Sequence, residues 1–154
     1  MVQPKCLRAW VVALASASVL GLALALGASA LAATDDELRR FAGRVGLSDA
    51  EAFVQTIDSL DRTGRWPSWY LSKEEAARRG WKPGRDLWSV APGKSIGGDA
   101  FANRERRLPA GLRYREADLD YKGGARNAKR LILGSDGRRW VTVDHYLSFQ
   151  AVPP

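Results

Sequence analysis

The spacing of the apolar residues changes near the middle of this chain, and no other feature constrains its fold as strongly. Before the change, apolar residues recur at helical spacing, which is typical of one face of an amphipathic helix. These residues are Ala50, Phe53, Val54, Ile57 and Leu60. Beyond Pro83 and Gly84, apolar residues fall in short strand-like segments that Gly, Pro and Asp separate. Helices followed by antiparallel strands predict an α+β fold.

Capping signals set the starts of the predicted helices. Thr34 with Glu37 would open a short or mobile helix that reaches residue 45, and Ser48 with Glu51 would open the amphipathic helix, which ends near Gly64. The other predicted elements are a helix over residues 72–80, a helical turn over 86–90, strands over 95–100, 113–119, 129–133 and 139–144, a turn at 135–137, and a short strand around 149.

The N-terminus follows the three-part pattern of a secretory signal. Lys5 and Arg8 form a basic start, an apolar run spans residues 9–26, and small residues follow it. We expect cleavage after Ala32, with Ala30 as the second choice, which would make the mature protein extracellular. An uncleaved membrane anchor is the alternative, because the apolar run is about long enough to span a bilayer.

Composition limits the cofactors and partners of the remaining chain. The 154 residues carry a net charge of +7 and include one His and one Cys, too few for a zinc cluster. Loss of Lys5 and Arg8 with the signal would lower the net charge to +5, and Cys6 would leave with them. A basic, cysteine-free domain of about 120 residues must rely on its core. Its charge favours a polyanionic partner, which could be nucleic acid, anionic lipid or an acidic protein.

One predicted strand carries the first candidate catalytic groups. Alternation places Tyr114, Glu116 and Asp118 on one of its faces. Two arginines and the single histidine of the chain follow this strand. They are Arg126, Arg130 and His145.

Such a set suits the cleavage of a phosphodiester bond in RNA. A carboxylate or imidazole can accept the proton of the 2′-hydroxyl, and an imidazolium can donate a proton to the departing 5′-oxygen. Guanidinium and ammonium groups can stabilise the negative charge that builds on the phosphoryl oxygens. No metal ion is needed for this chemistry.

Each of these residues also has a plain structural interpretation. A single histidine near a strand end is often a surface or capping residue, and Glu116 could pair with a cation on a neighbouring strand. Arg126 and Arg130 could form a solvated edge. The residues alone therefore indicate a secreted, basic α+β protein that handles a polyanion.

Many short motifs follow one another beyond residue 65. They are Trp66-Pro67, Tyr70-Leu71-Ser72-Lys73, Gly80-Trp81, residues 90–101, Asn103-Arg104-Glu105, Leu108-Pro109, residues 114–118, Arg126-Asn127, Arg130 and Asp144-His145-Tyr146. Together, and in this order, they closely resemble the secreted bacterial guanyl-preferring ribonucleases of the barnase type, over about residues 53–149. The resemblance implies a fold with N-terminal helices packed on a single antiparallel β-sheet.

The resemblance also implies a role for each candidate site residue. Glu116 would be the general base and His145 the general acid, with these roles reversed when a cyclic phosphate is hydrolysed. The phosphate would be held by Lys73, Arg126 and Arg130. The substrate-binding residues would be Asp99, Phe101, Ala102, Asn103, Arg104, Glu105 and Tyr146. Among these, backbone N–H groups and the Glu105 carboxylate would read guanine, and the aromatic rings of Phe101 and Tyr146 would flank the bases.

The implied activity is that of a metal-independent endoribonuclease. It would cleave single-stranded RNA after guanosine through a 2′,3′-cyclic phosphate, which it would then hydrolyse to a 3′-phosphate. The enzyme would be a secreted monomer without a cofactor, and an acidic protein of the barstar type would be its inhibitor. Two alternatives stay open, a non-catalytic relative that binds RNA or an inhibitor, and a membrane-tethered nuclease.

Two features depart from the family pattern. Ala102 stands where relatives carry a serine, although the backbone donors of that loop would survive the change. Residues 33–47 lie largely outside the resemblance, as an N-terminal extension before a ribonuclease domain of residues 48–154. This extension could be a pro-segment, a linker or an extra helix.

Overall fold

The signal segment predicted over residues 1–32 lies outside the part of the chain that can be described, apart from Ala32. The computed structural model describes residues 32–154. Within those residues, no helix is long and apolar enough to cross a membrane. The alternative of a membrane anchor over residues 9–26 also concerns residues outside the described part.

The predicted helices are all present. They are α1 (Asp35–Arg44), α2 (Ala50–Thr63), α3 (Lys73–Arg78) and a 3₁₀ turn, η1 (Leu87–Ser89). The capping box predicted at Thr34 forms, and a second one, between Ser72 and Glu75, opens α3. Helix α2 ends at Gly64, as predicted, where a left-handed backbone with φ of 67° closes the helix.

The predicted start of α2 is wrong by one residue. Asp49, not Ser48, is the N-cap, and its carboxylate accepts the backbone N–H of Ala52 at 3.0 Å. Glu51 does not close a capping box with Ser48. It accepts two hydrogen bonds from Arg39 of α1 instead, so a contact between helices replaces the local one.

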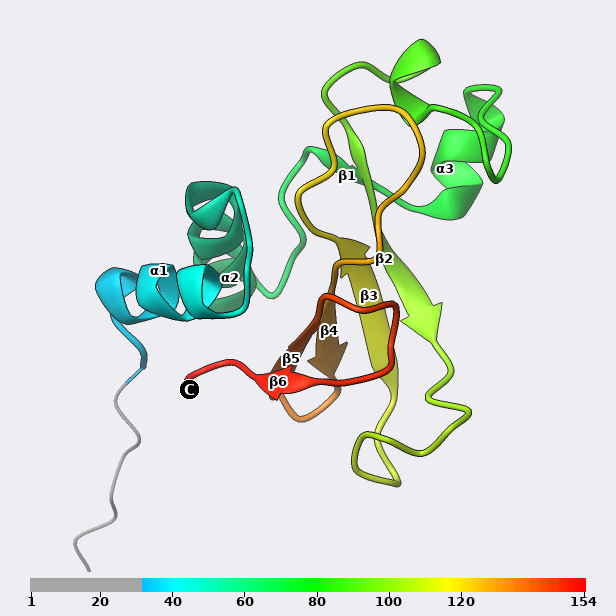
Figure 1. Ribbon diagram of the computed structural model, residues 1–154. Helices are drawn as coiled ribbons and strands as arrows, with labels where there is room; N and C mark the ends of the chain where they lie inside the picture. The colour runs from blue at the N-terminus through cyan, green and yellow to red at the C-terminus, as the bar shows by residue number, and fades with distance from the viewer. Residues whose placement is uncertain (1–31) are drawn as a thin grey trace, which may run out of the picture.

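The strands form one six-stranded sheet in chain order (Figure 1). They are β1 (Tyr70–Leu71), β2 (Ser95–Phe101), β3 (Tyr114–Asp118), β4 (Arg130–Gly134), β5 (Arg139–Thr142) and β6 (Gln150–Ala151). Strands β2 to β6 pair antiparallel, and the predicted turn at residues 135–137 joins β4 to β5. The sequence does not predict β1, which has two residues and pairs parallel with β2. The expected α+β fold with helices on a single, otherwise antiparallel sheet is confirmed.

Helices α1 and α2 lie together on one side of the sheet, at the left of Figure 1, and α3 lies apart from them at the right. The largest core fills the space between these two helices and the facing side of the sheet. Its buried side chains are Leu38, Phe41, Ala42, Leu47, Phe53, Val54, Ile57, Leu60, Leu119, Leu131, Val141 and Val152. The first four belong to residues 33–47, so this extension forms a helix that shares the core.

The side chains of β3 alternate between the two faces of the sheet, as predicted. Leu119 points toward α2 with the core just described, and we call this side the α2 face. Tyr114 belongs to a second cluster with Ile132 and Trp140 on the opposite side. Glu116 shares the side of Tyr114, so we call it the Glu116 face.

The short strand β1 fixes the start of α3. Tyr70 packs over Gly97, where a Cβ atom would lie 2.5 Å from the tyrosine ring, so only glycine fits. The Tyr70 O–H donates to the Asp118 carbonyl at 3.0 Å, and burial raises the pKa of Tyr70 to about 12, which keeps this donor protonated. The chain then passes through the Ser72 cap, and Lys73 is the first residue of α3.

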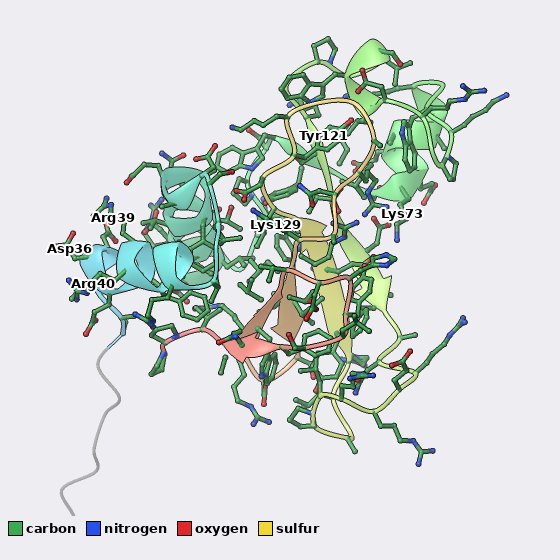
Figure 2. The ribbon with its side chains drawn as sticks, viewed as in Figure 1. Asp36, Arg39, Arg40, Lys73, Tyr121 and Lys129 are labelled. Atoms are coloured by element: carbon green, nitrogen blue, oxygen red, sulfur yellow. The ribbon has the colours of Figure 1, made fainter. Side chains whose placement is uncertain are left out.

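Asp120 joins the N-terminal helices to the loop between β3 and β4. Its carboxylate accepts the backbone N–H groups of Ser48 at 2.8 Å and Asp49 at 3.0 Å, and the Lys129 ammonium group at 2.7 Å. Lys129, labelled in Figure 2, also donates to the Gly46 carbonyl at 2.7 Å. Burial opposes ionisation of Asp120, but these donors outweigh it and lower its pKa. The β3–β4 loop is therefore fixed against the connection between α1 and α2.

Candidate active site

Glu116 lies in the middle of β3 and is buried, with 6% of its surface exposed. Its Oε1 atom accepts a hydrogen bond from Lys73 Nζ at 2.9 Å, and its Oε2 atom accepts one from the Tyr146 O–H at 2.8 Å. Each carboxylate oxygen therefore has its own hydrogen-bond donor. Burial and the bond to Glu116 raise the pKa of Tyr146 to about 12, so the phenol stays a donor. The structure thus brings three predicted site residues into direct contact.

Asp99 supports Lys73 rather than the base-binding loop. It stands opposite Glu116 in the β2–β3 pairing. Its carboxylate accepts the backbone N–H of Lys73 at 3.0 and 3.1 Å, at the N-terminus of α3. Burial raises the pKa of Asp99 in spite of this contact. Asp99 therefore positions the lysine that reaches Glu116.

Asp118 holds the two arginines predicted to bind phosphate. Arg126 donates from Nε at 2.7 Å and from a terminal nitrogen at 2.6 Å to the two Asp118 oxygens. Arg130 is buried, and its Nε lies 3.0 Å from Asp118 Oδ1, an ion pair without the alignment of a hydrogen bond. Burial would lower the pKa of Arg126, but the bonds to Asp118 outweigh it and the pKa is raised. Both guanidinium groups are therefore fixed in direction and charged.

The sequence places Asp118 on the face of Glu116 but gives it no role. In the structure Asp118 is only 2% exposed. Because a buried carboxylate needs cationic partners, the nearby pair Arg126 and Arg130 was the signal that could have identified it.

His145 stands in the loop after β5, and it is exposed. Its backbone and that of Tyr146 are left-handed, with φ of 58° and 71°. The Thr142 hydroxyl donates to Asp144 Oδ1 at 2.9 Å and accepts the Tyr146 N–H at 3.0 Å. Asp144 also accepts from the Ser148 side chain at 2.5 Å and its backbone at 2.9 Å. These bonds lower the pKa of Asp144 to about 2 and hold the histidine loop in place.

His145 and the arginines line one shallow pocket of about 440 Å³. Its walls are Gly84, Arg85, Ala125, Arg126, Asn127, Ala128, Arg130 and His145. The next residue, Tyr146, binds Glu116. The predicted acid, the predicted base and the two arginines predicted to bind phosphate therefore belong to neighbouring parts of the surface.

The predicted base-binding loop lines a second pocket, of about 300 Å³. Its walls are Ala100, Phe101, Ala102, Asn103, Arg104, Glu105, Arg107, Glu116, Tyr146 and Phe149. The rings of Phe101 and Tyr146 stack on each other, with centroids 5.2 Å apart and an angle of 19° between their planes. A base that binds here must separate the two rings or stack on an outer face of one of them.

Side chains of the base-binding loop fix its shape. Asn103 has a left-handed backbone with φ of 44°, and its amide exchanges hydrogen bonds of 3.0 and 3.1 Å with the backbone of Leu108. Glu105 Oε2 accepts from Arg107 Nε at 2.8 Å, and Arg107 also donates to the Leu147 carbonyl at 2.6 Å. Arg107, which the sequence does not single out, thus ties the base-binding loop to the histidine loop.

The chemistry available here is proton transfer and anion stabilisation. A carboxylate and an imidazole can exchange protons with a substrate, and Lys73, Arg126 and Arg130 can stabilise a phosphate. Among residues 32–154, no group of three or more His, Cys, Asp or Glu side chains is arranged to hold a metal ion.

Comparison with known proteins shows the family of this chain. Residues 54–153 match the sequence model of a family described as ribonuclease. A ribonuclease of Heyndrickxia coagulans is 48% identical over 103 residues, which cover 65% of this chain and 94% of the relative. Ribonucleases of Bacillus intermedius and Bacillus pumilus are each 45% identical over 109 residues, which cover 69% of this chain and 67% of each relative. The chain belongs to the ribonuclease family.

This ribonuclease is an RNA-cleaving enzyme, and the predicted resemblance to the barnase type is confirmed. Every candidate site residue from Lys73 to Tyr146 lies within the residues that match the family, whereas α1 precedes them. The family match therefore covers the candidate site but not the N-terminal helix that shares its core.

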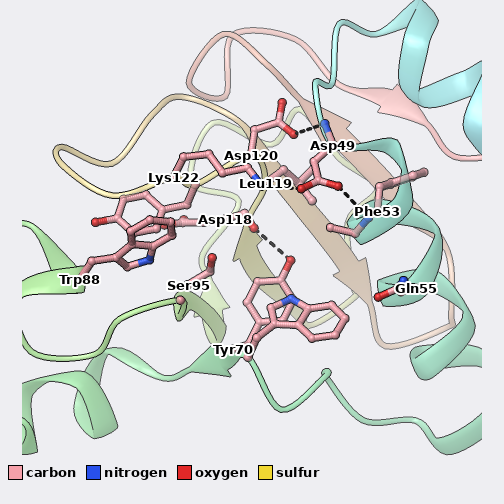
Figure 3. A pocket seen from close by; sticks show the side chains of 14 residues that line it. Asp49, Phe53, Gln55, Tyr70, Trp88, Ser95, Asp118, Leu119, Asp120 and Lys122 are labelled. Atoms are coloured by element: carbon pink, nitrogen blue, oxygen red, sulfur yellow. Dashed lines mark hydrogen bonds and ion pairs between the residues drawn. The ribbon is translucent and has the colours of Figure 1, made fainter.

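Another pocket of the ribonuclease, of about 400 Å³, lies between α2 and the start of the β3–β4 loop (Figure 3). Its walls include Asp49, Phe53, Trp88 and Lys122. None of the predicted catalytic or base-binding side chains lines it.

Proposed function

We propose that this ribonuclease is a secreted, metal-independent endoribonuclease that cleaves single-stranded RNA after guanosine. The observation that carries the proposal is the contact of Glu116 with Lys73 and Tyr146, beside the arginines that Asp118 holds. A carboxylate in this position can accept a proton while the neighbouring cations bind a phosphate.

In the first step, the Glu116 carboxylate takes the proton of the 2′-hydroxyl group of guanosine. The 2′-oxygen attacks phosphorus, and the bond from phosphorus to the 5′-oxygen breaks. The His145 imidazolium donates its proton to that 5′-oxygen, which leaves as the hydroxyl group of the downstream nucleotide. A 2′,3′-cyclic phosphate remains on the guanosine.

In the second step, the two residues exchange roles. Neutral His145 takes a proton from water, and the water oxygen attacks phosphorus. The bond from phosphorus to the 2′-oxygen breaks, and protonated Glu116 returns its proton to that oxygen. The product is a 3′-phosphate, and both side chains regain their starting protonation states.

The cations would stabilise the charge on the phosphoryl oxygens in both steps. Arg126 uses Nε and one terminal nitrogen on Asp118, and its other terminal nitrogen makes no hydrogen bond within residues 32–154. That nitrogen can donate to a phosphate. The Lys73 ammonium group has three N–H donors, of which one reaches Glu116 and the others can turn to the substrate.

The proposed guanine preference rests on residues 101–105. The Glu105 carboxylate can accept the N1 and N2 protons of guanine. Its Oε1 atom makes no hydrogen bond to a residue of the described part, whereas Oε2 accepts one from Arg107. Ala102 removes the hydroxyl group that relatives carry but keeps the backbone N–H. A site that must satisfy these donors and acceptors would discriminate against bases that cannot.

The proposed secretion rests on the signal pattern of residues 1–32. Mass spectrometry of protein from the culture medium should find a chain that begins at Ala33. An intact N-terminus in the membrane fraction would favour the tethered alternative. We also propose that the enzyme acts as a monomer and that an acidic inhibitor of the barstar type would bind its basic site.

Four dinucleoside phosphates that differ in the 5′ base test the proposed reaction, with a chelator present throughout. We expect the guanosine substrate to be cleaved fastest, with a cyclic phosphate as the first product on chromatography. Glu116→Ala should abolish cleavage, whereas the exposed Glu74→Gln should not change it. Cleavage without base preference would contradict the role of residues 101–105. No cleavage by folded protein would favour the binding-only relative.

A further inference from the structure

A row of paired residues crosses the α2 face of the sheet near the base-binding loop. Ala100 of β2 pairs with Arg115 of β3, Arg115 pairs with Leu133 of β4, and Leu133 pairs with Arg139 of β5. Paired residues on neighbouring strands point to the same face. This row therefore lies on the side of the sheet opposite Glu116.

The same four residues line a groove of about 610 Å³, which we call the reverse groove. Its other walls are Leu60, Gly64, Arg113, Tyr114, Gly134, Ser135 and Gly137. The row forms its floor, and the C-terminal end of α2 and the β4–β5 turn lie beside it. Leu60 and Leu133 supply apolar surface, so the chemically distinctive groups of the groove are its arginines.

Two of the three arginines in the reverse groove have no carboxylate partner among the residues that the structure describes. Arg139 forms an ion pair with Asp61. Arg113 and Arg115 are exposed, and neither guanidinium forms an ion pair or hydrogen bond with another residue between 32 and 154. Like charges that converge without counter-charges repel one another, so the groove favours an anionic occupant.

The reverse groove and the base-binding pocket share one wall residue. Ala100 lines both of them. Strand β1 pairs only with Ser95 and Ile96 of β2, so the end of β2 at Ala100 is an uncovered edge of the sheet (Figure 1). The small Ala100 side chain leaves a path over this edge from the Glu116 face to the α2 face.

We infer that the reverse groove binds the phosphodiester backbone of the RNA strand on the 5′ side of the cleaved guanosine. This inference rests on the proposed function. The reacting phosphate would lie at the Asp118 end of β3, and the downstream nucleotide leaves from there. The base-binding loop lies at the Tyr114 end of the same strand, next to Arg113. Beyond Arg104 and Arg106 of the base-binding loop itself, RNA upstream of the guanosine would next meet Arg113 and Arg115 in the reverse groove.

Substrates of different extension test the inference. A guanosine dinucleotide, an oligonucleotide extended only at its 5′ end and one extended only at its 3′ end are cleaved by the wild type and by Arg113→Gln/Arg115→Gln. We expect 5′ extension to raise kcat/KM of the wild type, and the double variant to lose about tenfold on that substrate at low salt. Its kcat/KM on the dinucleotide and on the 3′-extended substrate should stay unchanged.

A matched control distinguishes an effect of the reverse groove from an effect of net charge. Arg78→Gln/Arg79→Gln removes the same two charges from the exposed end of α3 and should leave all three substrates unaffected. An equal loss in both double variants would overturn the inference, as would no gain from 5′ extension or a loss confined to the 3′-extended substrate. Thermal unfolding should show that both variants fold like the wild type.

Binding measurements keep the test independent of the proposed reaction. The 5′-extended oligonucleotide is titrated against Glu116→Ala, with and without the two groove substitutions, at several salt concentrations. Loss of two phosphate contacts should reduce the slope of log K against log salt by about 1.4. An unchanged slope would overturn the inference even if no substrate were cleaved. Cleavage of dinucleotides without guanine preference would instead count against the proposed function alone.

Discussion

Tyr146 donates its O–H to Glu116 at 2.8 Å, while its ring stacks on Phe101. One side chain therefore contacts both Glu116, the proposed general base, and the pocket proposed for guanine. A nucleobase that separates the two aromatic rings must displace Phe101 or Tyr146, and displacement of Tyr146 would also move the phenol that binds Glu116. Guanine binding and proton transfer are coupled through this residue in the proposed mechanism.

Tyr146→Phe keeps the ring and removes the hydrogen bond to Glu116. Because a hydrogen bond to a charged group contributes about 1.5–3 kcal/mol, we expect kcat/KM to fall about tenfold or more. Glu116 keeps its contact with Lys73, so cleavage should be reduced rather than abolished. Tyr114→Phe is the matched control, since the Tyr114 O–H donates to the Pro109 carbonyl and not to Glu116. An equal kcat/KM in Tyr146→Phe and in wild type would contradict the coupling.

Asp118→Asn removes the counter-charge of Arg126 and Arg130. Loss of one partner from a buried ion pair should lower the free energy of unfolding by about 3 kcal/mol, measured by urea denaturation. The two guanidinium groups also lose their fixed directions, so KM should rise. Glu74→Gln breaks the exposed pair with Arg78 and should cost less than about 1 kcal/mol. Equal losses in the two variants would show that Asp118 has no special role.

Asp144→Asn tests the loop that carries His145. The pKa of Asp144 is lowered to about 2 from an ordinary value of 3.8, chiefly by the hydrogen bonds from Ser148. A lowered pKa stabilises the native state above the unfolded value, and this stability is lost as the pH falls through the native value. The difference in Tm between wild type and variant should therefore shrink as the pH falls from about 4 to about 2.

The same substitution should reduce activity, because the loop would no longer hold His145 in one position. Misplacement by about 1 Å can cost up to about 100-fold in rate, so we expect kcat at neutral pH to fall about 10- to 100-fold. Ser148→Ala should have a smaller effect in the same direction, since it removes one of the two Ser148 bonds. A constant Tm difference across the acid range would contradict the assignment.

Phe41→Ala tests the place of residues 33–47 in the fold. Phe41 is 3% exposed and stacks on Phe53 of α2 with ring centroids 5.8 Å apart. Its truncation should lower the free energy of unfolding by about 3–4 kcal/mol and leave kcat/KM unchanged well below Tm. Arg40→Ala, on the exposed side of the same helix, should change stability by less than about 0.5 kcal/mol. If Phe41→Ala has no effect on unfolding, these residues are a dispensable extension.

The elements with strong local signals could be predicted from the sequence. The caps at Thr34 and Ser72 and the helix stop at Gly64 depend on residues close to them in the chain. The exact start of α2 could not be predicted in this way, because Asp120, 72 positions further along the chain, accepts the Ser48 N–H. Strand β1 could not be predicted either, because its two residues form a strand only by pairing with β2.

The candidate site could likewise be predicted only in part. The residue types at Glu116, Lys73 and His145 could be recognised from motifs along the chain. The contacts that organise them join distant positions, as in the bond from Tyr146 to Glu116, 30 residues apart, or from Arg107 to the Leu147 carbonyl, 40 residues apart. Spacing along a strand indicates which face a side chain takes, but not which loop will meet it there.

His145 and Tyr146 are adjacent residues with left-handed backbones, a conformation that glycine adopts at lower cost by about 1 kcal/mol each. At Tyr146 the bond to Glu116 and the stacking on Phe101 offset this cost, but the exposed His145 has no such compensation. Glycine at position 145 would therefore stabilise the loop and remove the proposed acid. Thermal stability and catalytic activity therefore place opposite demands on this loop. An engineer who wants a hardier enzyme should leave the loop alone and seek stabilising changes in parts of the fold where substrate does not bind.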